Sequence, residues 1–490
     1  MKIVNRRAFI GSAAALGAAA MITSCAPSGS GKKEESKTAD ARAEATDLSG
    51  WKLAEKNPAV VPLVPFSAPK KLTDEEVEDL LENRAVVTED FVNSDGTAVA
   101  PEFQMVRNTV NRCGIGVGSL ISKDHQFDLW KRLYTEEEAQ AINEMPMYQR
   151  FTAAEFAEIC GKSVGDCTKL CNQIADKGML HREHDDDGET RFFVVGSEYG
   201  YYEANIFNID ADFLKLKDAT GSEDIDVGPQ FVDSGTSMYR SYPVDLDVVV
   251  DGNYTEWEDW RAIFSRNDTF SVSPCVCRCR QLIQAGKAAN AREVLDKGLT
   301  LDEHPVETCI CTGKHAEYMI EIGAGRQISA EEAISIVEDG ISKGMIVESV
   351  YTKAAENICL CHCDCCLNVG AVRTLNGGPA LEAYSNFNLV HRKDDCIKCG
   401  TCVERCPMKA ITLDPDGYPI VDNACVRCGQ CATVCPKGAR GLLRKTETEL
   451  DEIPETLVDD YVEKARVRAS KGYLYDFTGQ SGAKAPAAAE

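Results

Sequence analysis

Two copies of one cysteine spacing constrain this chain more than any other feature of its sequence. The segments CIKCGTCVERCP, beginning at Cys396, and CVRCGQCATVCP, beginning at Cys425, both read C-x2-C-x2-C-x3-C followed by proline. A cubane [4Fe–4S] cluster needs four thiolates, and in this pattern three come from one tight loop and the fourth from the other repeat. We therefore expect two clusters with crossed ligands. The first set is Cys396, Cys399, Cys402 and Cys435, and the second set is Cys425, Cys428, Cys431 and Cys406.

A second concentration of cysteines precedes these repeats. The sequence contains 23 cysteines, and ten of them lie between Cys275 and Cys366, in the groups CVCRCR, ETCICTG and ICLCHCDCC. Disulfide frameworks are typical of small exported domains that lack a core, whereas this chain has length for about two to four packed units. Because alternate residues of a strand share a face, we expect the first and third groups to form extended ridges of thiols that bind metal.

Ten cysteines are compatible with several different metal contents. They could supply two clusters with two ligands left over, one cluster plus zinc, or one cluster and some disulfides. Because the chain already depends on iron–sulfur assembly, a further [4Fe–4S] cluster is favoured over zinc. His362 is flanked by Cys361 and Cys363, so its side chain could either ligate a metal or make an ordinary hydrogen bond.

The first 25 residues, MKIVNRRAFIGSAAALGAAAMITSC, predict export and lipidation. Their apolar run is shorter than the roughly 20 residues that a spanning helix needs. The pair Arg6 and Arg7 resembles a twin-arginine signal, whose pathway carries folded proteins, and the segment ending at Cys25 resembles a lipobox. We expect lipid on Cys25 and a location at the outer face of the cytoplasmic membrane. The small polar residues of 26–50 predict a flexible linker.

The next part of the chain predicts helices and a hairpin. Residues 51–145 are predicted to be a helical region, with one helix from Thr135 to Asn143. Residues 146–200 predict two helices and a β-hairpin that turns at Asp187 and Gly188, an order that resembles a winged helix. The acidic hairpin and a formal net charge of −25 would repel a phosphate backbone. We therefore expect no nucleic-acid partner and interpret this region as structural or as a docking module.

The cysteine motifs resemble known families. The two repeats, with the apolar segments AITL (410–413) and YPIV (418–421), resemble bacterial dicluster ferredoxins. Over about residues 125–445 the chain is similar to an uncharacterised bacterial family of 4Fe–4S dicluster proteins, whose cysteine run is usually denser than ICLCHCDCC; His362 and Asp364 depart from it. The resemblance implies an additional metal centre. Its expected ligands are Cys275, Cys277, Cys309, Cys359, Cys361, Cys365 and Cys366.

These observations predict an α+β, multidomain protein. A helical and winged-helix-like N-terminal part would precede a cysteine-rich α+β middle domain at residues 201–385, a dicluster ferredoxin fold at 386–446 and an acidic helical or disordered tail at 447–490. The predicted cofactors are two [4Fe–4S] clusters and one further [4Fe–4S] cluster or zinc. Eight occupied thiolates leave no open iron in the ferredoxin module, so we expect no catalytic residue there.

The predicted function is electron transfer. No flavin, pterin or nucleotide motif is present, and no small-molecule substrate is identified, so a non-catalytic carrier is favoured over an enzyme. It would pass electrons to or from a redox protein partner at the membrane. From Asp394 to Lys445 there are eight Lys or Arg against six Asp or Glu, a balance that favours docking to a partner. The alternatives are a reductase with an active metal centre in the cysteine-rich domain, fed by the ferredoxin clusters, and a metal-dependent sensor or scaffold.

Overall fold

The computed structural model describes most of the chain beyond its N-terminal segment. The predicted export signal, Cys25 and most of the predicted linker lie outside the described residues. All the described residues belong to one unit, residues 45–490. The described ranges are 47–59, 91–92, 98–103, 125–146, 149–195, 200–222, 237, 239–374, 385–450 and 452–470.

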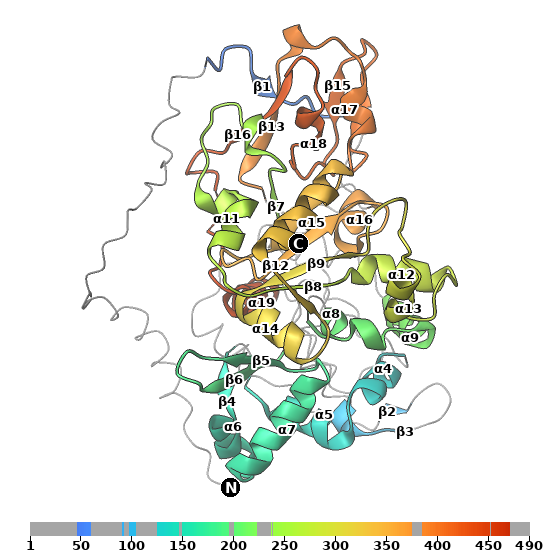
Figure 1. Ribbon diagram of the computed structural model, residues 1–490, viewed down its shortest axis with the longest axis vertical. Helices are drawn as coiled ribbons and strands as arrows, with labels where there is room; N and C mark the ends of the chain where they lie inside the picture. The colour runs from blue at the N-terminus through green and yellow to red at the C-terminus, as the bar shows by residue number, and fades with distance from the viewer. Residues whose placement is uncertain are drawn as a thin grey trace, which may run out of the picture. The chain divides into compact units, whose positions relative to one another are not determined.

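A six-stranded antiparallel sheet forms the centre of the cysteine-rich region (Figure 1). Its strand order is β10-β8-β9-β12-β11-β7, and each neighbouring pair is antiparallel. The strands are short and mostly buried, as apolar and β-branched runs such as IVESV predict. They are β7 (Tyr239–Tyr242), β8 (Phe270–Pro274), β9 (Glu307–Thr312), β10 (Arg326–Ile328), β11 (Ile346–Val350) and β12 (Asn357–Cys361).

Two amphipathic helices pack against this sheet. Helix α14 (Gly313–Glu321) contacts β8 and β9, and α15 (Ala330–Ser342), with Ser329 as its N-cap, contacts β8, β9, β11 and β12. The contact is close, because a Cβ atom on Gly340 would lie 2.6 Å from Leu360 Cδ1. Since neighbouring residues of a strand face opposite sides, the cysteines beside Leu360 on β12 lie on the face away from α15.

The predicted helix–helix–hairpin order is present between residues 151 and 193. Helix α6 (Ala153–Cys160) begins at a capping box formed by Thr152 and Glu155, and α7 (Val164–Asp176) begins at Ser163. Each cap satisfies helix N–H groups that have no partner inside the helix. The three-stranded sheet that follows has the order β4-β6-β5. Its strands are β4 (Phe151–Thr152), β5 (His181–His184) and β6 (Thr190–Phe193). The resemblance to a winged helix stays a prediction.

Cysteines of these two helices are packed in the core. Cys167 and Cys171 are buried, and the sulfurs of Cys160 and Cys167 lie 3.4 Å apart. Burial raises the pKa of Cys171 to about 12, which keeps its thiol protonated. This environment fits a packing role, because an enclosed cysteine behaves as a small hydrophobic residue.

Further helices and short elements surround the two sheets. The predicted helix near Thr135 is α5 (Glu136–Glu144), whose capping box joins Thr135 and Glu138. The others before the dicluster region are α4 (His125–Leu133), α8 (Tyr202–Ala204), η3 (Ile206–Asn208), α9 (Ala211–Ser222), η4 (Leu246–Val248), η5 (Glu256–Glu258), α11 (Trp260–Ser265), α12 (Val276–Gln284), α13 (Ala291–Asp296) and α16 (Leu367–Thr374), with strands β2 (Phe91–Val92) and β3 (Ala98–Val99).

The C-terminal region is built from two small sheets and two short helices. Strand β13 (Phe387–His391) pairs with β16 (Arg440–Arg444) and with β1 (Lys52–Leu53). The strand β1 was not predicted from the sequence. The remaining elements are η6 (Lys393–Asp395), α17 (Thr401–Glu404), β14 (Ile411–Leu413), β15 (Pro419–Val421), α18 (Gln430–Thr433) and, in the tail, α19 (Leu457–Ser470). Among the described residues, no helix combines the length and the apolar character needed to cross a bilayer.

Candidate metal centres

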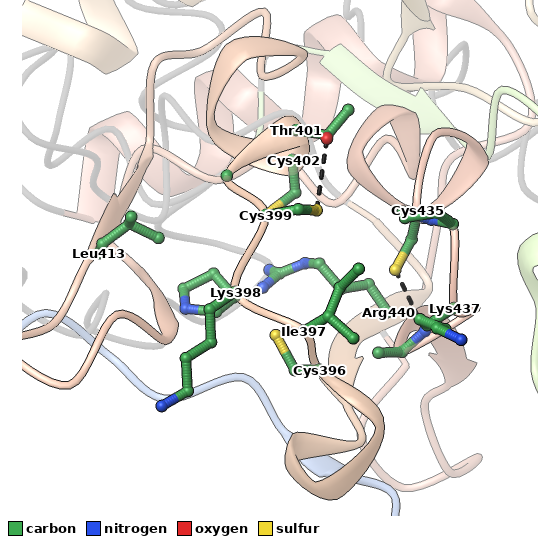
Figure 2. Close-up of a pocket in the computed structure, with 14 residues that line it drawn as sticks. Cys396, Ile397, Lys398, Cys399, Thr401, Cys402, Leu413, Cys435, Lys437 and Arg440 are labelled. Atoms are coloured by element: carbon green, nitrogen blue, oxygen red, sulfur yellow. Dashed lines mark hydrogen bonds between the residues drawn. The ribbon is translucent and has the colours of Figure 1, made fainter.

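Four thiols line one cavity of the C-terminal region. Cys396, Cys399 and Cys402 come from the first repeat, and Cys435 follows α18 of the second repeat. Figure 2 shows these side chains around a common space, which amounts to about 390 Å³, part of it open to solvent. Gly400 precedes α17 with a φ of 80°, a left-handed conformation that allows the chain to turn tightly here.

The other four thiols line a second cavity. Cys425, Cys428 and Cys431 come from the second repeat, and Cys406 comes from the first. This cavity contains about 300 Å³ of empty space, again including its opening. The structure therefore groups the eight thiols in the two crossed sets that the sequence predicts. Their role as ligands is part of the proposal made below.

The two repeats also place backbone amides against equivalent sulfurs. The amide of Ala410 donates to Cys406 Sγ over 3.4 Å, and the amide of Ala439 donates to Cys435 Sγ over 3.2 Å. In both repeats the donor lies four residues after the last cysteine. Hydrogen bonds of this kind favour the thiolate form and are one of the ways in which a protein sets the potential of a cluster.

A buried arginine lies between the two sets of thiols. Arg440 lines the first cavity, its side chain is 4% exposed, and its three guanidinium nitrogens are buried without a hydrogen-bond partner of normal geometry. Burial lowers the pKa of Arg440, but the thiols of Cys431 and Cys402 outweigh burial and raise it. A permanent positive charge is thus held next to both cavities.

Comparison with known families agrees with this geometry. Residues 395–439 match the family described as the 4Fe-4S dicluster domain. This segment is a 4Fe–4S dicluster domain. Its two cavities each offer four thiols, which is the donor set that a [4Fe–4S] cluster needs. The prediction of two [4Fe–4S] clusters is therefore confirmed.

Two relatives resemble the dicluster region. The pyruvate synthase subunit PorD of Pyrococcus abyssi is 33% identical over 56 residues, and that of Pyrococcus horikoshii is 34% identical over 56 residues. Each match covers 11% of this chain and 53% of the relative, so the chain spans about half the length of these proteins. No solved structure matches the chain. The dicluster domain and the similarity to PorD support an iron–sulfur electron-transfer role.

Seven thiols of the cysteine-rich region form one series of interacting side chains. The neighbouring thiols of Cys277 and Cys361 lower the pKa of Cys366 to about 6. In the same way, those of Cys311 and Cys359 lower the pKa of Cys309. In order, the series runs through Cys275, Cys277, Cys366, Cys361, Cys359, Cys309 and Cys311.

The structure brings together most, but not all, of the thiols expected at an additional centre. Six of the seven expected residues belong to the series. The exception is Cys365, which is buried with its sulfur 3.6 Å from the backbone oxygen of His362. Cys311 belongs to the series although it was not among the expected ligands. It lies two residues after Cys309 on β9. The alternation of that strand is the signal that identifies it.

The prediction of extended thiol ridges is wrong for CVCRCR and only partly right for ICLCHCDCC. Strand β8 ends at Pro274, and Cys275 is the N-cap of helix α12. Residues two apart on a helix point in different directions, so Cys279 is buried in the core while Cys277 reaches Cys366. In the third group, β12 ends at Cys361, and the later cysteines lie in the turn that precedes α16.

Two buried charged side chains next to these thiols were not predicted. Arg278 is fully buried and donates to Thr308 Oγ1 over 2.7 Å and to the Leu360 carbonyl over 2.6 Å. Glu348, on β11, pairs in register with Cys359. Burial raises the pKa of Glu348 to about 7, against the opposing effects of Cys361 and Asn368. An acidic residue inside the apolar run IVESV is the sequence signal for it.

Proposed function

We propose that this protein is an iron–sulfur electron relay that is anchored by lipid on Cys25 at the outer face of the cytoplasmic membrane. Single electrons would pass between a redox protein partner and the protein through the two clusters of the dicluster domain. The proposed ligands of the first cluster are Cys396, Cys399, Cys402 and Cys435. Those of the second cluster are Cys425, Cys428, Cys431 and Cys406. With all eight iron positions bound by protein, neither cluster has a site for a substrate.

The observation that carries this proposal is the different surroundings of the two cavities. The first cavity lies next to solvent: Cys399 is exposed, and the apolar side chains of Ile397 and Leu413, which line it, are 55% and 46% exposed. Lys398 and Lys437 line the same cavity. Exposed apolar side chains ringed by charge are typical of a protein-docking surface, so we place the exchange of electrons with the partner here.

The second cavity lies against the cysteine-rich region. The amide of Val244 donates to the Cys428 carbonyl over 2.9 Å, and Ser241 Oγ donates to the Val426 carbonyl over 2.6 Å. Gln430 Nε2 donates to the Met345 carbonyl, at the start of β11, over 2.8 Å. These bonds hold the second cluster site beside the sheet that carries the thiol series. Electrons that enter at the first cluster would therefore move toward the cysteine-rich region.

The partner and the location follow from the chemistry of the chain. We infer a partner with a surface of mixed apolar and acidic character, since the dicluster segment is mildly basic although the whole chain has a net charge of −25. A nucleic-acid partner is not part of this proposal, because that net charge repels phosphate. The twin-arginine-like signal suits export of a protein whose clusters are already assembled.

Substitutions on the docking surface test the relay. Ile397→Glu and Leu413→Glu should slow cluster reduction by the native membranes at least tenfold, while reduction by dithionite, which needs no docking, should stay unchanged. Val164→Glu is the control, because Val164 is 51% exposed on α7, outside the dicluster domain. Equal rates for all three variants with membranes would contradict docking at the first cluster.

A reductase is the second candidate, and the thiol series beside the second cluster favours it. In that case the ferredoxin clusters would feed an active metal centre in the cysteine-rich domain. The test is whether a small ligand such as cyanide changes the spectrum of a centre other than the two ferredoxin clusters. A change would support the reductase, and an unchanged spectrum would favour the simple relay.

A further inference from the structure

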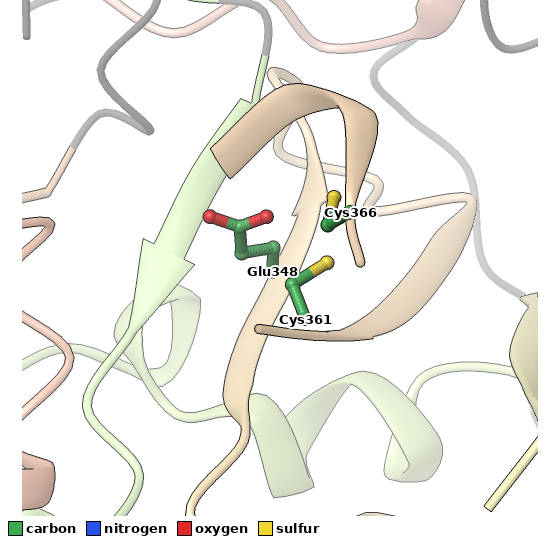
Figure 3. A group of neighbouring side chains, drawn as sticks. All are labelled: Glu348, Cys361 and Cys366. Atoms are coloured by element: carbon green, nitrogen blue, oxygen red, sulfur yellow. The ribbon is translucent and has the colours of Figure 1, made fainter. Parts of the chain in front are cut away.

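One part of the thiol series is shaped for a single metal ion. The carboxylate of Glu348 and the sulfurs of Cys361 and Cys366 all lie within 4.8 Å of one another. Figure 3 shows them arranged around a common space. They come from separate elements: Glu348 from β11, Cys361 from the end of β12, and Cys366 from the turn before α16. The three groups are therefore brought together by the tertiary fold and not by a local loop motif.

The spacing distinguishes this group from the cluster sites of the same protein. Two ligands that share one ion, at about 2.3 Å for sulfur and about 2.1 Å for oxygen, can be at most about 4.6 Å apart. Each thiolate of a cubane instead binds a different iron atom. Among the residues that the structure describes, no three thiols of the dicluster domain come within 4.8 Å of one another. The Glu348 group therefore has the dimensions of a mononuclear site.

Cys277 offers a fourth ligand. The thiol of Cys277, in the first turn of α12, interacts with Cys366. The amide of Leu367 donates to Cys277 Sγ over 3.4 Å, a contact that stabilises a thiolate and orients the side chain. Cys277 therefore lies beside Cys366 but outside the three groups that share the 4.8 Å limit, and we include its thiol as the fourth ligand.

The state of Glu348 points independently to a bound cation. Its side chain is 0% exposed, and neither carboxylate oxygen accepts a hydrogen bond of normal geometry. The side-chain amide of Asn368 is buried next to it and is likewise without such a bond. Burying an acidic group without a partner is costly, so a carboxylate in such a place is normally paired with a cation or coordinates a metal.

We propose that Glu348, Cys277, Cys361 and Cys366 bind one divalent transition-metal ion of the zinc class, separate from the two clusters. Three thiolates suit a borderline or soft ion such as zinc, whereas calcium and magnesium prefer sites made of oxygen. Four protein ligands make the site closed and structural, and it joins α12, β11, β12 and the turn before α16. The inference does not depend on the relay, because it concerns a different set of residues.

Metal analysis of the full chain, purified without oxygen, tests the proposal. We expect about eight iron and eight sulfide per chain, from two cubanes, together with one zinc. Glu348→Gln should lose the zinc and keep the iron, and Glu348→His should restore it, because three cysteines and one histidine form a common zinc site. Twelve iron atoms without zinc, or full zinc in Glu348→Gln, would overturn the proposal.

A control variant and a measurement on the wild type guard against misfolding. Glu356→Gln removes a half-buried carboxylate of the same region, which already accepts bonds from Thr352 Oγ1 and the Leu457 amide and has no thiol neighbour among its interactions. The zinc content of this variant should be unchanged. X-ray absorption at the zinc edge of the wild type should show three sulfur neighbours at about 2.3 Å and one oxygen at about 2.0 Å. Four sulfur neighbours would rule out Glu348 as a ligand.

Discussion

The guanidinium of Arg440 lies beside the thiol of Cys431 and also lines the cavity that contains Cys402. Strand β16 begins at this residue, directly after the second repeat. The same stretch of backbone therefore carries Cys435, which completes the first set of thiols, and Arg440, whose positive charge is buried between the two cluster sites. Solvent does not screen this charge, because the side chain is buried.

Removing that charge should lower the reduction potential of the clusters. A cluster gains one negative charge on reduction, and a buried cation favours the reduced state. We expect Arg440→Met to lower the potential of at least one cluster by roughly 60 mV or more, which for one electron corresponds to about 1.4 kcal/mol. A redox titration followed by electron paramagnetic resonance measures it. Lys437→Met, at the solvent side of the same cavity, should shift the potential much less. Equal shifts would contradict the role given to burial.

The crossed ligand sets predict which cluster each cysteine affects. Cys406→Ala should damage the second cluster, held by Cys425, Cys428 and Cys431, and leave the first intact. Cys435→Ala should do the reverse. Iron content should fall from about eight toward about four in both variants, and spectra of the reduced protein should identify which cluster remains. The pairing is wrong if Cys406→Ala removes only the first cluster.

Lipid on Cys25 should decide where the mature protein is found. We expect Cys25→Ala to be exported and released as soluble protein, because a covalent lipid would no longer hold it to the membrane. Replacing Arg6 and Arg7 with lysine should instead retain the precursor inside the cell. Fractionation and labelling with a lipid precursor measure both effects. Recovery of the wild type in the soluble cytosolic fraction would contradict the export proposal.

A buried histidine pair should make the protein less stable in acid. His181 Nε2 and His315 Nδ1 lie 2.8 Å apart and join β5 to α14. Burial lowers the pKa of both residues to about 3. Below the unfolded value of about 6.5, only the unfolded chain takes up these protons, so stability falls as the pH drops from 6.5 toward 3. At pH 5 the loss is roughly 2 kcal/mol for each histidine.

Thermal unfolding between pH 7 and pH 5 measures this loss. His315→Gln removes one of the two groups that titrate, so its midpoint should depend less steeply on pH than that of the wild type. Between pH 8 and pH 9 the two proteins should show the same slope, because both histidines are neutral there in the folded and in the unfolded chain. Identical slopes below pH 6.5 would show that the pair does not control acid stability.

The spacing of cysteines was enough to predict the dicluster domain. The spacing of its cysteines and its glycines and prolines determine the shape of single short loops. The loop that holds Cys396, Cys399 and Cys402 can therefore be predicted directly from the sequence. The same is true of helix α5, because the Thr135 cap and Glu138 are only three residues apart. Local interactions decide these features, and local sequence is sufficient to find them.

The thiol series and the group around Glu348 depend on contacts that only the tertiary structure decides. The spacing in CVCRCR fits a strand, but the chain turns into helix α12 after Pro274, and the direction of Cys277 then changes. Glu348 lies next to Cys361 because β11 pairs with β12 in one register, and a shift of one residue would turn its side chain to the other face. Sequence determines which side chains are available; strand register and helix packing determine which of them meet, because such contacts join residues far apart in the chain.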